Sequence, residues 1–121
     1  MTTLQGRPYT KAVPFARTFS GAVDELLTIW TPVGAYFELA MIIAKSTAAG
    51  EYAICDTVGA NIIGYIQFDG ANFSRLDLGL AGIRANRLTQ ANLALLDPVG
   101  IAATIHGVCY GWEVTAEGSY R

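Results

Sequence analysis

The side chains able to do catalytic chemistry are few in this sequence, and their spacing does not suit it. His106 is the only histidine, and it shares the face of an alternating apolar run with Val108 and Tyr110. No G-x-S-x-G turn is available to expose a nucleophilic serine. Asp24 and Glu25 are adjacent, and adjacent side chains of a strand point to opposite faces, so they cannot act as an acid–base pair. We therefore predict that the chain is not an enzyme.

Metal and phosphate sites are not predicted either. Cys55, Cys109 and one histidine do not make a Cys/His zinc pattern. The G-L-A-G stretch at Gly79–Gly82 lacks the lysine and the following helix of a phosphate loop, so we interpret it as a chain reversal. No cofactor is expected. Since Met1–Thr10 is polar and resembles no export signal, reduced buried thiols are the default, although a disulfide between the two cysteines stays open.

The composition points to a protein that hides much of its surface. Hydrophobic residues make up 52% of the 121 residues and charged residues 15%, against about 25% in ordinary globular domains. A membrane span is not predicted, because the most apolar stretch, Ala35–Ala44, contains Glu38 and stops at Lys45, well short of ~20 apolar residues. The net charge of −2 and the lack of a basic stripe exclude a nucleic-acid partner. We therefore expect a self-assembling subunit.

Short alternating runs and turn signals follow one another along the chain. The turn signals recur about every 8–12 residues, as in antiparallel sandwiches. We predict an all-β fold, an antiparallel jelly-roll-like sandwich of about eight short strands in two sheets. The runs are Val23–Thr31, Tyr36–Ser46, Glu51–Thr57, Asn61–Phe68, Phe73–Leu78, Ala91–Leu96 and Ile101–Val114, with turns at Asp69–Asn72 and Asp97–Gly100.

The last run has one bulky and one nearly bare face. We predict that the bulky face lies in the core; it carries Val108, Tyr110 and Trp112. The bare face suits the close approach of another backbone, from a second sheet or from another subunit. Its residues are our subunit-contact candidates: Gly107, Cys109 and Gly111.

The first twenty residues show no regular period, and Pro8 and Pro14 argue against a helix. We expect either a frayed terminus or an extended arm lying on a partner. The arm's apolar anchors would be Leu4, Tyr9, Val13, Phe15 and Phe19. The predicted organisation is thus an arm at residues 1–20, a sandwich at 21–116 and a tail at 117–121.

Aromatic residues offer an alternative function, a ligand platform. Trp30 lies directly before Thr31-Pro32 at a predicted strand end, which favours an exposed ring. With neighbouring polar loops it would form a glycan or receptor site. The residues of this alternative ligand site are Trp30, Asp69, Asn72 and Arg84.

Several motifs together resemble small virion proteins of tailed bacteriophages, of the capsid decoration or cement type. They are W-T-P at Trp30–Pro32, F-E-L at Phe37–Leu39, L-D-L-G-L-A-G-I-R-A-N at Leu76–Asn86, A-N-L-A-L-L at Ala91–Leu96 and H-G-V-C-Y-G-W-E-V at His106–Val114. The resemblance implies a β-sandwich or β-tulip subunit without catalytic residues. It implies a homo-oligomer, commonly a trimer, that binds the major capsid protein on the capsid surface and is assembled in the host cytoplasm. The alternative is a fibre-tip or other receptor-binding or glycan-binding jelly roll.

Overall fold

The computed structural model describes residues 3–4, 7–8, 11–31, 35–57, 62–78 and 92–115, and every regular element among them is a strand. The strands are β1 (Thr3–Leu4), β2 (Arg7–Pro8), β3 (Lys11–Phe19), β4 (Glu25–Trp30), β5 (Ala35–Ser46), β6 (Ala49–Asp56), β7 (Ile62–Asp69), β8 (Ser74–Asp77), β9 (Leu93–Asp97) and β10 (Ala103–Thr115). Within these described ranges there is no helix long and apolar enough to cross a membrane.

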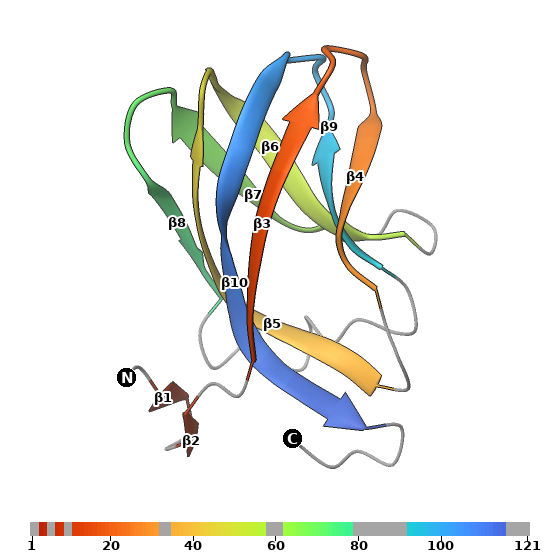
Figure 1. Cartoon of the computed structure of the whole chain (residues 1–121), viewed down its shortest axis with the longest axis vertical. Coiled ribbons are helices and arrows are strands. Elements are labelled where there is room, and N and C mark those ends of the chain that lie inside the picture. Colours follow the sequence, from red (N-terminus) through yellow and green to blue (C-terminus); the bar gives the residue numbers. More distant parts are fainter. Residues whose placement is uncertain are drawn as a thin grey trace.

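Eight of the strands form two four-stranded antiparallel sheets that face each other (Figure 1). One sheet has the order β3-β10-β5-β8 and the other β4-β9-β6-β7. The pairing is nested, since β6 pairs with β7, β5 with β8, β4 with β9 and β3 with β10. One long hairpin folded over on itself gives this order, which is the jelly-roll arrangement. The predicted fold class is confirmed.

The turns follow from local chemistry at one end of the sandwich. Gly70 and Gly100 both have a φ of +84°, a conformation that favours glycine. The carboxylate of Asp97, which is fully buried, accepts hydrogen bonds from the backbone N–H groups of Gly100 (2.9 Å) and Ile101 (2.7 Å). Both turns predicted from Asp-x-x-Gly or Asp-Gly signals are therefore present, and each is fixed by its own aspartate.

The N-terminal boundary differs from the prediction. Lys11–Phe19 is not part of an arm but the edge strand β3, paired with β10 at nine consecutive positions. Phe15 and Phe19 are buried in the core and Val13 packs against it. Sequence analysis did not predict this strand, because Pro14 interrupts its alternating pattern. An edge strand tolerates a proline. The sandwich thus begins at Lys11; β1 and β2 form a separate two-stranded ribbon.

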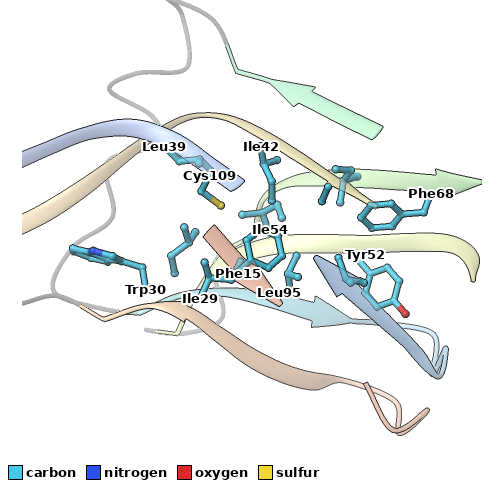
Figure 2. Packing of buried hydrophobic residues seen from close by; sticks show 14 of the residues in the cluster. Phe15, Ile29, Trp30, Leu39, Ile42, Tyr52, Ile54, Phe68, Leu95 and Cys109 are labelled. Carbon is cyan, nitrogen blue, oxygen red and sulfur yellow. The ribbon is translucent and has the colours of Figure 1, made fainter. Parts of the chain in front are cut away.

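The core fills the space between the sheets with aliphatic and aromatic side chains (Figure 2). Figure 2 places Trp30 at one end of this cluster, and Tyr52 with Phe68 at the other. Trp30 packs against Phe37, with ring centroids 5.5 Å apart, and is 9% exposed. The prediction of an exposed Trp30 is therefore wrong, because the last residue of β4 still faces the opposite sheet.

The two faces of β10 are reversed relative to the prediction. Ile105 and Cys109 are fully buried in the core cluster, whereas Val108 and Tyr110 are only half-buried and point away from it. The prediction assumed that the bulkier side chains of β10 are the buried ones. The inward positions of this central strand instead need small residues, because the neighbouring strand comes close there. Trp112 is fully buried, but it shares the outward face with Tyr110.

Gly107 and Gly111 allow β10 to lie close to β5. A Cβ atom on Gly107 would overlap the carbonyl oxygen of Ile43, and one on Gly111 would overlap that of Glu38. The close neighbour of this bare face is therefore a strand of the same chain. Cys109 lies between them at 0% exposure, so these residues are covered within the subunit.

A bulge in β5 changes which of its side chains face the core. Tyr110 pairs with Met41, but Gly111 pairs with Leu39, so Ala40 is the extra residue. As a result Leu39 and Ile42 both belong to the core cluster despite being three positions apart. Strict alternation along the strand would place these two residues on opposite faces.

Replacing Gly111 by alanine should lower the free energy of unfolding by about 1–3 kcal/mol, because the added methyl group overlaps backbone that cannot move aside. Gly64→Ala is the matched control, since its new methyl would meet only side-chain ends, those of Leu76 at 3.1 Å and Leu78 at 3.8 Å. We expect the control to change stability by less than about 1 kcal/mol in urea unfolding. Equal losses in both variants would contradict the close approach of β10 and β5.

Replacing Tyr52 by phenylalanine should cost about 1 kcal/mol, because its hydroxyl donates a 2.9 Å hydrogen bond to the carbonyl of Ile101. Burial, followed by the charges of Asp97 and Glu25, raises the pKa of Tyr52 to about 12. Tyr65→Phe, at a ring that is 51% exposed, is the control and should shift thermal unfolding little. A Tyr52→Phe protein as stable as the parent would mean that this bond contributes nothing.

Candidate interaction surface

Part of the outward side of the β3-β10-β5-β8 sheet, along β3 and the middle of β10, lacks the polar covering usual for a solvated sheet face. On β3 the side chains that alternate with the core residues are small or rigid: Ala12, Pro14 and Ala16, all exposed. Antiparallel sheets open to water on one side normally alternate hydrophobic and polar residues. This face therefore departs from the usual pattern for a solvated surface.

The neighbouring strands continue this pattern. Tyr110 lies opposite Ala12, and Val108 lies opposite Pro14. Ile43 of β5 lies opposite Val108 on the other side and is half-buried. We call the six residues Ala12, Pro14, Ala16, Ile43, Val108 and Tyr110 the outer apolar face. It contains no charged side chain.

Ionic and polar groups border this face without entering it. At one end Ala16 lies opposite His106, and His106 lies opposite Lys45 of β5. Beyond them the hydroxyl oxygens of Thr18 and Thr104 are 3.3 Å apart. On the β8 side the guanidinium of Arg75 donates to Asp77 at 2.8 Å. An apolar centre with a polar rim is the usual anatomy of a protein–protein contact.

Pro14 gives β3 a protected edge. The β3–β10 ladder runs without a register shift through Pro14 and Val108, so no ladder position is skipped at the proline. Proline has no N–H to donate, and it fits an edge strand when its nitrogen faces away from the ladder. Addition of a further strand along this edge is disfavoured, so the flat face, rather than the edge, is the surface available for contact.

The outward side of the other sheet is more mixed. Tyr65 is 51% exposed, but Gln67 and Glu51, which lie opposite each other in the β6–β7 pair, are exposed polar neighbours. Leu26 of β4 is 37% exposed on the far edge of the same sheet. Apolar side chains are thus separated by polar ones here.

A second feature lies at the rim where β5 ends and β10 begins. A concavity of about 350 Å³ is lined by Lys45, Ser46, Thr47, Gly70 and His106. The ring of Phe73 contacts that of His106 edge to face, with centroids 5.6 Å apart and an interplanar angle of 88°. This rim holds an imidazole and a lysine close to an exposed aromatic ring.

The residues of the alternative ligand site are not brought together. Trp30 lies in the core, at the end of the sandwich opposite the Asp69–Asn72 turn (Figures 1 and 2). Arg84 lies outside the described residues. Asp69 and Asn72 do meet, but within their own turn, where the Asn72 side chain donates to Asp69 at 3.0 Å.

The expected arm residues also separate. Val13, Phe15 and Phe19 belong to the sandwich. Leu4 is in β1, and its side chain is not among those described; Tyr9 lies outside the described residues.

The cysteines are free and buried. Burial raises the pKa of the Cys109 thiol to about 12, and burial followed by the charge of Asp56 raises that of Cys55. Cys109 belongs to the core cluster and Cys55 alternates with the core residues Tyr52 and Ile54, so the two thiols lie on opposite sides of a sheet layer. Across the described part of the chain, no group of three His, Cys, Asp or Glu residues is arranged to hold a metal ion.

Comparisons with known proteins do not assign a family. No family model, no curated protein and no solved structure matches this chain.

Sequence reasoning missed both surfaces described above. The outer apolar face was hidden because Val108 and Tyr110 were assigned to the core. Small residues at alternate positions, Ala12, Pro14 and Ala16, were the available signal for a strand at the N-terminus. The rim had no sequence signal, because Lys45, Phe73 and His106 come from three separate strands or turns.

The Asp69 turn yields a pH prediction. Hydrogen bonds from the backbone N–H groups of Asn72 and Ala71, then from the Asn72 side chain, lower the pKa of Asp69 to about 2. Because the folded pKa lies below the ordinary value of 3.8, this stabilisation is present above about pH 4 and is lost as the pH falls toward 2.

An NMR titration of the Asp69 carboxyl carbon should show a midpoint near 2. In Asn72→Ala the side-chain donor is removed but both backbone donors stay, so the midpoint should move upward without reaching that of a free aspartate. A midpoint near 4 in the parent protein would contradict the hydrogen-bonded turn.

Proposed function

We propose that this protein is a non-enzymatic structural subunit that works by forming contacts, and that it acts as a capsid decoration or cement protein on a virion surface. The observation that carries the proposal is the outer apolar face. A sheet face of small and apolar residues with no charge is costly to leave in water and favourable to cover with protein. The outer apolar face is covered by another copy of this chain, by the major capsid protein, or by both.

The fold supports the same function. Jelly rolls serve as capsid and lectin domains, and their two closed sheets present broad faces on a rigid frame. The motifs that resemble phage decoration proteins lie largely on this frame, in β5, β8, β9 and β10. A cement protein needs a rigid body that resists pulling forces, together with faces that adhere to neighbours.

The low charge content supports an oligomeric subunit over a monomer. Only 15% of the residues are charged, which is too few to cover a small monomer in the usual way. None of the six residues of the outer apolar face is charged, and the cations Arg75 and Lys45 lie beside it, so desolvating the six side chains themselves costs little. A homotrimer is the assembly that the resemblance implies.

Receptor or glycan binding is a second candidate function. The observation that favours it is the rim concavity beside Phe73 and His106, and not the residues around Trp30.

Replacing Ala12 by glutamate places a carboxylate on the outer apolar face without disturbing the core, since Ala12 is exposed and its ladder partner on β10 is Tyr110. Burying an unpaired charge in a contact costs several kcal/mol, so self-association should weaken at least about tenfold in sedimentation equilibrium. Gln67→Glu adds the same charge to the other sheet at an exposed position and should leave association unchanged.

Two results would overturn the proposal. One is a parent protein that sediments as a monomer at high concentration and does not bind capsids. The other is dissociation by Gln67→Glu with none by Ala12→Glu, which would move the contact to the β4-β9-β6-β7 sheet.

A further inference from the structure

The rim concavity has a chemical character distinct from that of the outer apolar face. Its five lining residues come from the end of β5, the turn into β6, the turn between β7 and β8, and the start of β10. Among the described residues that line it, none is a carboxylate. At about 350 Å³ it lies at the small end of the range of ligand sites, about 300–1,000 Å³.

Two basic side chains stand next to each other at this site. Lys45 and His106 are direct partners in the β5–β10 register, and both alternate with core residues, so both point outward. Opposed side chains in an antiparallel pair have Cβ atoms about 4.5–5.5 Å apart. The Lys45 ammonium and a ring N–H of His106 can therefore donate to the same anionic group.

The hydroxyl at the edge of the site is set up as a donor. The Thr47 oxygen accepts a hydrogen bond from the backbone N–H of Thr104 at 2.9 Å, which leaves its own O–H available to donate. Lysine and threonine therefore both donate toward a ligand here.

Asp69, which precedes the lining residue Gly70, is held in another interaction. The carboxylate of Asp69 accepts from Ala71 and Asn72 within its own turn. Asp77, farther along β8, accepts from Arg75. The donors of the concavity are thus not neutralised by a lining carboxylate.

An exposed aromatic ring lies beside the concavity, in contact with His106, one of its lining residues. Phe73 is 59% exposed, a large fraction for an aromatic ring, and its contact with the His106 ring holds it beside the basic pair. Binding sites that combine an aromatic surface with a few fixed polar groups recognise small ligands by shape and charge together. A sugar ring offers the apolar C–H face that such an aromatic surface accepts.

We propose that this concavity binds one anionic monosaccharide unit of a glycan. Its carboxylate lies between Lys45, His106 and the Thr47 hydroxyl, and its ring packs against Phe73. The lining residues all come from one subunit, and His106 lies opposite Ala16, so the site adjoins the outer apolar face.

The test is an NMR titration of the full-length protein with glucuronate, with N-acetylneuraminate, with glucose and with inorganic sulfate. We expect saturable shifts at Lys45, Thr47 and His106 with at least one of the two acidic sugars, and none with glucose at the same concentration. Sulfate should bind more weakly, because it satisfies the donors but not Phe73.

Variants separate charge from ring recognition. Lys45→Gln should weaken binding of the acidic sugar about tenfold, because a charge-assisted hydrogen bond is lost. Lys11→Gln, which removes the same charge at the opposite end of the sheet, should leave it unchanged. Phe73→Ala should weaken binding of the sugar but not of sulfate, and thermal unfolding checks that each variant is folded.

No saturable shift with either acidic sugar overturns the proposal. So does sulfate binding as tightly as the acidic sugar with no effect of Phe73→Ala, which would indicate recognition of charge alone. Equal weakening by Lys11→Gln and Lys45→Gln would place the effect in the overall charge of the protein and would also overturn it.

Discussion

The close approach of β10 and β5 is the constraint on which the rest of this structure depends. β10 is the longest strand and lies between β3 and β5, so it joins the N-terminal edge to the remainder of its sheet. Gly107 and Gly111 leave room for the β5 backbone, and Cys109 fills the core between them. Because the small side chains of β10 lie inward, its larger ones, Val108 and Tyr110, lie outward. The interior fit of one strand thereby creates the apolar surface on its other side.

The strands and turns of this protein can be predicted from its sequence better than the direction of its side chains can. Seven strands and two turns could be predicted, because alternation and Asp-Gly or Asp-Pro signals are local. The faces of β10 could not, because bulk favours burial only where there is space, and the space is set by β5. The same applies to β5, where one extra residue, Ala40, reverses the alternation after Leu39. β3 was missed because Pro14 suggests irregular chain until its place at a sheet edge is known.

The candidate sites depend even more on tertiary structure. Trp30 appeared to be an exposed strand end, yet β4 carries it under the opposite sheet, where Phe37 covers it. Phe73, Lys45 and His106 are neighbours only because β8, β5 and β10 are successive strands of one sheet. What the sequence does indicate is the low charge content. The structure shows where this leaves uncharged side chains exposed, on the outer apolar face.

The nested pairing of first strand with last has a consequence for how the chain folds. Phe15 pairs with Gly107, and Phe19 with Ala103, so the edge of the sandwich closes only when the two ends of the chain meet. Contacts of such long sequence separation are slow to form, since the entropy of closing the loop is lost before the contact stabilises the fold. During synthesis β3 has no partner until β10 has left the ribosome, and Phe15 and Phe19 stay exposed until then. The last strand to be made is therefore the one that completes the core, and a chain cut before Ala103 would leave both β3 and β5 as open edges.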